Sequence, residues 1–320
     1  MVKFISVIIC THNPRLNFLE KVLNGLKAQT LPVNNWELLI IDNASTDKKV
    51  LNSVDLSWHF NAKVMEEKKL GVIWARISGI NNSRGEHLIF IDDDNVIFSN
   101  YLQDVCHIFE QFPKLGAIGG KSLPEFEIEP ESWVREFFDK LALRDLGNQE
   151  QTFFFDTPVV EQKKYPLCAP IGAGMAVRKE AVQPYVKRIS AHKAHQIFDR
   201  KGESLFSGGD NDMVLSVLES GWGVGYFPPL GLTHIIPKER LDKNYLGRLN
   251  RGIMASWPIV LALYGICPWD KISRWTVQLR QIKAYFTCRA WAGPAQYVRW
   301  QGACGLFEGL SWLSKIENPL

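Results

Sequence analysis

Three consecutive carboxylates follow a short apolar run. Asp92, Asp93 and Asp94 come directly after "HLIFI" (87–91). Adjacent carboxylates repel one another and resist desolvation, so stability alone does not explain them. In an extended segment alternate side chains share a face, which predicts that Asp92 and Asp94 point together and Asp93 points away. Two carboxylates on one face suit Mg²⁺ or Mn²⁺, which would in turn neutralise a diphosphate; the alternative is a solvated acidic loop.

A fourth carboxylate also comes directly after an apolar run. Asp42 directly follows the apolar run "LLII" (38–41). It either joins the same binding site or caps the segment after "NASTD", where Ser45 or Thr46 could serve equally. No GxGxxG motif follows either apolar run, which disfavours a Rossmann dinucleotide site.

Arg76 is the one cation in the otherwise apolar stretch "GVIWARISGI" (71–80). On a surface helix its guanidinium would extend to solvent along an apolar stem. Near three carboxylates and a phosphate it would instead pair bidentately with an anion. We favour the second interpretation.

Two more carboxylates open a helix in "GGDNDM" (208–213). Asp210 and Asp212 are both candidates for its N-cap. The Gly208-Gly209 pair lets a substrate approach the backbone closely, which favours Asp210 as a general base for an acceptor hydroxyl. His234, between an expected strand and Pro237, is either a structural histidine or a metal ligand.

The elements that would position these residues alternate along the first 120 residues. Apolar runs predict strands at 4–10, 36–41, 62–67, 87–91 and 115–120. Helical spacing predicts helices at 17–29, 71–85 (with Gly85 as its C-cap) and 99–111.

This alternation predicts an α/β fold with a mainly parallel sheet covered on both faces. Ligands bind such sheets outside the carboxyl ends of the strands. Residues 10–13, Asp42 and 92–94 all follow strand ends, so we expect them to share one rim.

The second half of the chain is less regular and ends in helices. We expect a helix near 130–145, a Gly-rich loop, strand and helix over 168–182, a helix within 206–222 and two short strands after it. Further helices are expected at 242–264, 271–291 and 295–316. We therefore predict a catalytic domain over residues 1–240 and a helical C-terminal region over 241–320.

Charge is distributed unevenly. The net charge of +3 is too small to indicate nucleic-acid binding. From Lys238 onward, 12 Lys/Arg face 5 Asp/Glu, a net of +7, so the preceding residues carry −4. The scattered cysteines indicate a reducing compartment, and no apolar run is long enough for a signal peptide or a membrane span. The sequence predicts a cytoplasmic protein, free or peripherally attached to the inner face of the plasma membrane.

Several stretches, in order along the chain, resemble glycosyltransferase family 2, the inverting nucleotide-sugar transferases of GT-A fold. They are "SVIICTHNP", "ELLIIDNASTD", "GVIWARISGINNSRGEHLIFIDDDN", "APIGAGMAVRKEA" and "GGDNDMVLSVLESGW". The similarity spans about residues 4–236. It implies a Rossmann-like GT-A domain, a nucleoside-diphosphate sugar donor and Mg²⁺ or Mn²⁺.

The resemblance also assigns roles to individual residues. It implies that Thr11 and Asn13 line the nucleoside pocket and that Asp42 binds the base. Arg76 would sit beside base and phosphate, Asp92 would contact the ribose, and Asp93 belongs to the same donor-binding motif. Asp94 would ligate the metal, with His234 as a second ligand, and Asp210 (or else Asp212) would be the catalytic base.

Two departures from the family pattern stand out. Gly209 replaces the acidic residue that usually precedes the base, and the frequent Arg or Gln near Ser216 is missing. Some phosphate or acceptor contacts must then come from elsewhere, and Lys238, Arg240 or Arg248 are candidates. A catalytically degenerate nucleotide- or glycan-binding protein is the alternative to a transferase in cell-surface polysaccharide assembly. A nucleotidyltransferase is disfavoured because "CTHNPRLN" lacks a triphosphate loop.

The C-terminal region holds six of the eleven tryptophans beside its excess of cations. Cationic, aromatic, amphipathic helices can lie in a membrane interface, which would suit a lipid-linked acceptor. Alternatively, these tryptophans pack onto the catalytic domain or form a homodimer.

Overall fold

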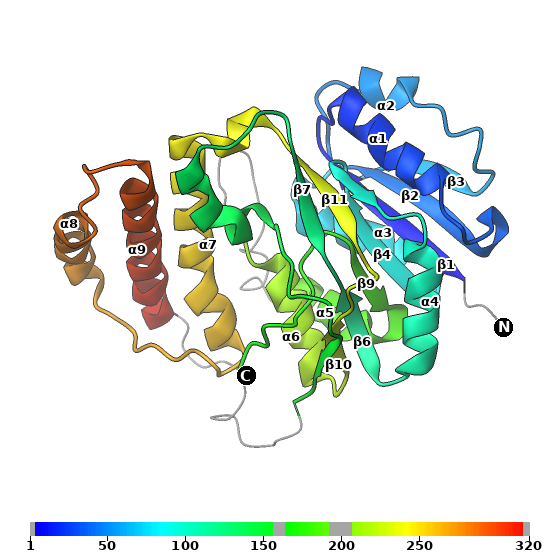
Figure 1. Cartoon of the computed structure of the whole chain (residues 1–320). Coiled ribbons are helices and arrows are strands. Elements are labelled where there is room, and N and C mark those ends of the chain that lie inside the picture. Colours follow the sequence, from blue (N-terminus) through cyan, green and yellow to red (C-terminus); the bar gives the residue numbers. More distant parts are fainter. Residues whose placement is uncertain (1–3, 156–163, 192–206, 316–320) are drawn as a thin grey trace.

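The computed structural model describes residues 4–155, 164–191 and 207–315 (Figure 1). Its strands are β1 (Ile5–Thr11), β2 (Trp36–Asp42), β3 (Ala62–Glu66), β4 (His87–Asp92), β5 (Asn95–Ile97), β6 (Leu115–Gly119), β7 (Ser122–Phe126), β8 (Gln151–Phe153), β9 (Met175–Arg178), β10 (Gly223–Tyr226) and β11 (Leu232–Ile236). Its α-helices are α1 (Leu16–Lys27), α2 (Lys49–Ser53), α3 (Val72–Asn82), α4 (Tyr101–Gln111), α5 (Lys179–Ala191), α6 (Gly209–Glu219), α7 (Lys243–Leu263), α8 (Val277–Thr287) and α9 (Pro294–Trp312).

A central sheet of eight strands runs in the order β3-β2-β1-β4-β9-β6-β10-β8. The strands β3, β2, β1 and β4 are parallel, as are β6 and β10. In contrast, β9 runs antiparallel to both of its neighbours, and β8 is antiparallel to β10. The predicted α/β class is confirmed, with a parallel half and a mixed half.

Each face of this sheet has its own apolar core, because alternate strand residues point to opposite faces. On one face Val7 and Ile9 pack with α1 and α4. On the other, Ile8 packs with α3, α5 and α6. The central strands β1, β2 and β4 are therefore mainly apolar, as expected for a sheet covered on both sides.

A second, three-stranded sheet in the order β5-β11-β7 was not expected from the sequence. It begins three residues after β4 ends, and β11 pairs antiparallel with β5 so that His234 lies opposite Asn95. This pairing brings Asn95 and His234, which are 139 positions apart in the sequence, to the same edge.

The C-terminal helices stack outward from the central sheet and its covering helices in the order α7, α9, α8 (Figure 1). The end of α7 joins the apolar core of α3, α5 and α6 through Ile259 and Val260. Its beginning forms a third core through Leu246 and Leu249, together with Phe137. The predicted boundary at residue 240 thus separates segments that share two cores. Among the described residues, no helix combines the length and apolar character required to cross a bilayer.

One helix end was predicted wrongly, and one predicted helix is present with a different helical type. Helix α3 ends at Asn82 rather than at Gly85. A Cβ on Gly85 would overlap the backbone of β1 at Ile5 and Ser6, so the glycine allows a close chain crossing instead of capping a helix. The helix expected near 130–145 is a kinked 3₁₀ segment, Ser132–Leu141, which ends at Ala142 in a left-handed conformation.

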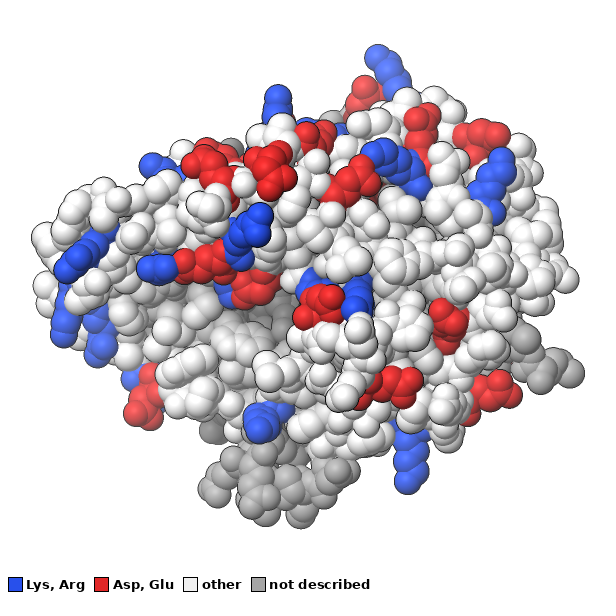
Figure 2. Space-filling model, in the orientation of Figure 1, with Lys and Arg blue, Asp and Glu red and all other residues white. Residues whose placement is uncertain are grey.

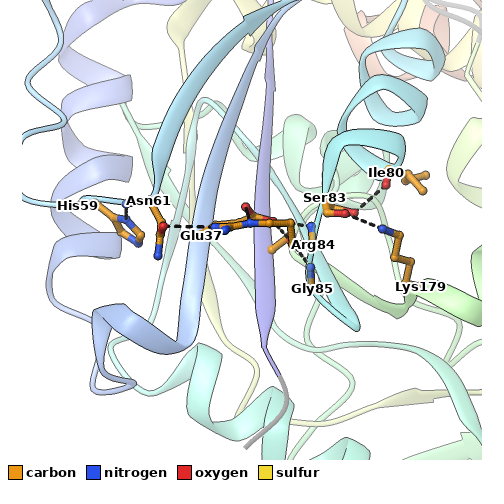
Figure 3. Close-up of polar contacts among 9 residues, drawn as sticks. Glu37, His59, Asn61, Ile80, Ser83, Arg84, Gly85 and Lys179 are labelled. Carbon is orange, nitrogen blue, oxygen red and sulfur yellow. Dashed lines mark hydrogen bonds and ion pairs between the residues drawn. The ribbon is translucent and has the colours of Figure 1, made fainter.

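A polar network fixes the edge of the sheet opposite the strands' carboxyl ends (Figure 3). Glu37 at the start of β2 is almost fully buried and accepts hydrogen bonds from Ser6 Oγ (2.6 Å) and from Arg84 N and Nε (2.6 and 2.8 Å). Ser6 Oγ in turn accepts from Gly85 N (2.8 Å). The connection from α3 to β4 is thereby tied to β1 and β2.

This network makes stability depend on pH. Burial opposes the charge of Glu37, but the donors Ser6 and Arg84 outweigh it and lower its pKa below the usual 4.5. A lowered folded-state pKa stabilises the fold above pH 4.5, and this contribution is lost as pH falls through the folded-state value. We expect Glu37→Gln to lower the free energy of unfolding by about 1–3 kcal/mol at pH 7 and by progressively less below pH 4.5.

Urea denaturation from pH 7 to pH 3 measures this difference. The matched control is Glu125→Gln, which removes an exposed ion pair with Lys21 and should change stability by less than about 0.5 kcal/mol. A cost of Glu37→Gln that stays constant with pH would contradict the assignment.

Candidate functional site

A cavity of about 500 Å³ opens at the carboxyl ends of the central strands. It is enclosed by segments from both halves of the chain. Its lining includes Thr11, His12, Arg76, Asp92, Asp93, Asp94, Tyr165, Gly172, Asp210, His234, Arg240, Tyr245, Leu249, Ile253, Met254 and Trp257. Most of the candidate site residues from the sequence analysis therefore line one cavity.

The acidic triplet forms a turn rather than an extended segment. Asp92 is the last residue of β4, Asp93 and Asp94 make the turn, and Asn95 begins β5. All three carboxylates line the cavity, so the expected alternation, with Asp93 pointing away, was wrong. The physical reason is that the chain leaves the central sheet here through a turn and enters the small sheet at β5.

Asp93 has an unusual environment. Its enclosure raises its pKa to about 7, and the neighbouring carboxylate of Asp94 adds to the shift. The hydroxyl of Thr11 at the end of β1 donates to Asp93 and partly offsets that rise. The fold thus concentrates negative charge at a position where it is unfavourable without a cationic partner.

A histidine and an arginine gather around Asp94. His234 Nε2 lies 3.4 Å from Asp94 Oδ1, and Arg240 Nη1 lies 3.1 Å from Asp94 Oδ2. Asn95 Nδ2 donates to Asp94 Oδ1 (2.9 Å) and fixes its orientation. Burial opposes the charge of Arg240, but Asp94 foremost among the carboxylates raises its pKa. Arg240 therefore supplies the positive charge that the acidic turn requires.

The donor set at this point is compatible with a divalent cation. A carboxylate and an imidazole are ligands that Mn²⁺ accepts, and Mg²⁺ uses one or two carboxylates together with substrate phosphates. Asp94 and His234 converge in that way, and the buried Nδ1 of His234 has no hydrogen-bond partner among the described residues. No three His, Cys, Asp or Glu side chains in the described ranges form a complete metal cage.

On another wall of the cavity, Arg76 and Asp210 form an ion pair. Arg76 from α3 is buried, whereas Asp210 in the first turn of α6 keeps 35% of its side chain exposed. The pair requires Gly172, because a Cβ there would overlap the Asp210 carboxylate and lie 2.7 Å from Arg76 Nη2. Arg76 thus pairs with an anion, as expected, but that anion belongs to the protein.

Asp212 lies outside the cavity lining. It is fully buried two residues further along α6, and Tyr264 Oη donates to its Oδ1 (2.7 Å). Asp212 therefore serves the core between α6 and the end of α7. Of the two candidates for the base, only Asp210 can reach a molecule in the cavity.

Asn13 and Asp42 also lie outside the cavity lining. Asn13 has a positive φ of 52°, and its Oδ1 accepts from Thr46 N (2.9 Å) and Oγ1 (3.1 Å). Asp42 is buried, and its Oδ1 accepts from Ser45 N (3.0 Å). These two side chains fix the loop after β2. For Asp42 this role is similar to the capping role considered from the sequence.

One wall of the cavity was not anticipated. Helix α7 contributes Tyr245, Leu249, Ile253 and Trp257. Trp257 packs edge-on against Tyr165 with ring centroids 5.0 Å apart. The apolar spacing of this helix is visible in the sequence, but it does not distinguish a core face from a cavity wall. Among the cations proposed for phosphate or acceptor contacts, Arg240 lines the cavity, whereas Lys238 and Arg248 do not.

Comparison with known proteins connects this chain to a family of glycosyltransferases. The profile of the family described as "Glycosyl transferase family 2" matches residues 6–185. Glycosyltransferase AglE of Haloferax volcanii is 34% identical over 93 residues, 28% of this chain and 30% of AglE. A Methanococcus voltae enzyme, dolichyl N-acetyl-alpha-D-glucosaminyl phosphate 3-beta-D-2,3-diacetamido-2,3-dideoxy-beta-D-glucuronosyltransferase, is 31% identical over 124 residues, 37% of this chain and 38% of that enzyme. The matched segments thus span less than two fifths of either relative.

The crystal structure of Staphylococcus aureus TarS in complex with UDP is similar over most of the chain. The match covers 98% of this chain and 91% of that chain, with a TM-score of 0.50 and 14% identity. At this identity the likeness concerns the fold alone. It agrees with the GT-A architecture expected for the catalytic domain.

The structural role of Asp212, as opposed to the cavity-facing position of Asp210, can be tested by measuring the free energy of unfolding. Tyr264→Phe removes the hydroxyl that donates to the buried Asp212, and we expect it to lower the free energy of unfolding by about 1–3 kcal/mol. Tyr285→Phe is the matched control, because its ring contacts Trp300 while its hydroxyl makes no hydrogen bond within the described residues. Its cost should be below about 0.5 kcal/mol. Equal unfolding midpoints for the two variants would refute the structural role given to Asp212.

Proposed function

The chain belongs to glycosyltransferase family 2, and from this premise we propose that it transfers a sugar from a nucleoside-diphosphate sugar to an acceptor hydroxyl with inversion at the anomeric carbon. The observation that carries the proposal is that one cavity holds both the acidic turn at Asp92–Asp94 and the solvent-accessible carboxylate of Asp210. An acidic turn suits the donor's diphosphate with its cation, and a separate carboxylate suits the acceptor's proton.

The donor binds along the edge formed by β1 and β4. Thr11, Asp92 and Asp93 offer hydrogen-bonding groups to ribose and base. Asn13 and Asp42 act from behind this surface, since they hold the loop after β2 in place. UDP is the first candidate nucleotide, because the structurally similar TarS was crystallised with it.

Asp94 and His234 would hold the divalent cation, whose role is to neutralise the diphosphate as its charge grows. Arg240 contacts Asp94 and His234, and its guanidinium is placed to pair with a phosphate oxygen as well. The neighbourhood therefore offers two sources of positive charge for the leaving group.

Asp210 takes the acceptor's proton. Its ion pair with Arg76 stabilises the anionic form, which is the form that can accept a proton. As the acceptor oxygen attacks the anomeric carbon, the bond to the diphosphate breaks, the electron pair leaves with the diphosphate, and the proton passes to Asp210. Arg76 is placed to balance charge on this wall of the cavity. A single displacement of this kind inverts the configuration and needs no enzyme nucleophile.

The acceptor is expected along α7. Trp257 and Tyr165 present aromatic surface to the cavity, and Leu249, Ile253 and Met254 add apolar surface beside it. Aromatic faces combined with nearby polar groups suit a glycan or a lipid-linked oligosaccharide. Relatives whose names refer to glycan assembly support a role in cell-surface polysaccharide synthesis.

A second function is favoured by one observation. Gly209 stands where the family usually places an acid, and the neighbouring Asp210 is already engaged by Arg76. A protein that binds a nucleotide or glycan without turnover would fit the same cavity. Both functions predict that a nucleotide binds, so only a measurement of turnover distinguishes the transferase from the binding protein.

Donor binding is tested by thermal shift with UDP, GDP, dTDP and CDP, each with and without Mn²⁺. A nucleotide at 100 times its Kd should stabilise the native state by about 2.7 kcal/mol, which raises the melting temperature. We expect one nucleotide to act only with Mn²⁺ and to lose its effect in Asp94→Asn. Glu125→Gln serves as the control carboxylate, since it lies on the surface. Stabilisation without any dependence on Mn²⁺ or Asp94 would overturn the proposed cation site.

Catalysis is tested by release of the nucleoside diphosphate from the donor identified in this way. We expect Asp210→Asn to lower the rate by about 10²- to 10⁴-fold, because the general base is lost while the side chain keeps its shape. Thermal shift by the nucleotide should be retained in this variant. Unchanged turnover in Asp210→Asn, or a wild type that binds the nucleotide but never releases product, would favour the binding function instead.

A further inference from the structure

Helix α8 and its flanks present a continuous apolar face to solvent. Trp275, Leu279, Ile282 and Phe286 are 91%, 70%, 57% and 61% exposed. Their spacing of four, three and four residues places them on one side of the helix. Trp291, 59% exposed, contacts Phe286 with ring centroids 5.9 Å apart and extends this face. These five residues are called the α8 face below.

The opposite side of α8 is already occupied. Ala284 is buried, Gln281 Nε2 donates to Glu308 of α9 (2.9 Å), and Trp300 Nε1 of α9 donates to Gln281 O (3.1 Å). Helix α8 is thus held against α9 by polar and small residues and by the ring of Tyr285, whose centroid lies 5.3 Å from that of Trp300, while Leu279, Ile282 and Phe286 remain exposed. This is the reverse of a surface helix whose apolar face covers a core.

Exposed apolar residues are concentrated in this region. Of thirteen large hydrophobic residues that are exposed in the described ranges, six lie between Trp269 and Trp291, and they include every exposed tryptophan of those ranges. Single exposed apolar residues need no explanation, but a contiguous patch indicates an interaction surface.

The same segment is strongly cationic. Residues 271–291 contain five Lys/Arg (Lys271, Arg274, Arg280, Lys283 and Arg289) and no Asp or Glu. All five are exposed, and none belongs to an ion pair in the part of the chain that the structure describes. Figure 2 shows Lys and Arg side chains gathered along the left edge of the molecule, where Figure 1 places α8.

We propose that the α8 face docks the protein onto an anionic membrane surface, with α8 lying in the plane of the interface. Leucine, isoleucine and phenylalanine enter the boundary between headgroups and acyl chains, and the tryptophans sit at headgroup level. The five cations meet the anionic lipid headgroups. This docking is a property of the surface itself and does not depend on the proposed transferase reaction.

A second copy of the chain fits this surface less well. A symmetric dimer through the α8 face would bring five cations of one copy against the same five of the other without any acidic residue of the segment between them. Like charges at an interface oppose association. An anionic bilayer satisfies the apolar and the cationic components at once.

Vesicle sedimentation of the full-length protein tests the proposal. The probes are phosphatidylcholine vesicles with and without phosphatidylglycerol. We expect binding to the anionic vesicles, with a partition coefficient that falls at least about 100-fold in Leu279→Gln/Ile282→Gln/Phe286→Gln. Arg280→Gln/Lys283→Gln should lower it about 25-fold at low salt, from about fivefold per cation.

The matched control is Phe60→Gln/Ile128→Gln, which removes two exposed apolar residues outside this region and should bind like wild type. Circular dichroism melts of every variant confirm that the fold is retained. Sedimentation velocity without vesicles measures self-association. Equal binding of wild type and the α8 variants to vesicles, or no preference for anionic lipid, overturns the proposal. The proposal is also overturned if the wild type sediments as a dimer, the α8 variants sediment as monomers and the control variant remains a dimer.

Discussion

The acidic turn at the end of β4 is the constraint on which the rest of the site depends. Three carboxylates in succession cannot be enclosed without compensating charge, because each disfavours ionisation of the others. The structure supplies this charge through Arg240, just beyond β11, and adds the Thr11 hydroxyl from β1 and the His234 ring from β11 as further polar contacts from distant segments. The small sheet exists at the point where these segments must meet, and its pairing of β5 with β11 sets His234 beside the turn.

Charge compensation also explains the second wall of the cavity. Arg76 is buried on α3, and a buried guanidinium requires an anion, which Asp210 provides. The close approach of Gly172 to this pair leaves no room for a side chain. The cavity thus contains two charge clusters, one rich in carboxylates and one balanced. Because of this asymmetry, the carboxylate-rich cluster suits the donor with its cation, and the balanced Arg76–Asp210 pair suits the residue that accepts the proton.

Helix α7 links the catalytic core to the outer helices. Ile259 and Val260 complete a core of the central sheet, while Tyr245 and Trp257 form a wall of the cavity. Through α9 the same helix carries α8, whose large apolar residues face outward. Of the arrangements considered for the C-terminal tryptophans, packing onto the catalytic domain occurs for Trp257, which contacts Tyr165. Trp275 and Trp291 remain exposed, and their contact with a membrane is a proposal.

Local patterns in the sequence were sufficient to predict the α/β class, the order of the main strands and helices, and the edge at which Thr11 and the acidic triplet lie. The family resemblance added Arg76, Asp210 and His234, which line the same cavity. Local patterns were sufficient because strand and helix periodicities, and the rule that parallel strands end at one rim, depend only on neighbours in the chain. Tertiary structure alone decided the turn at Asp93, the choice of Asp210 over Asp212 as the residue facing the cavity, and the positions of Asn13 and Asp42 outside its lining. It also decided which side of α8 stays exposed. Each of these features depends on which distant part of the chain lies against the residue, and no local pattern carries that information. Tyr264 lies against Asp212, and α9 lies against the side of α8 that holds Ala284.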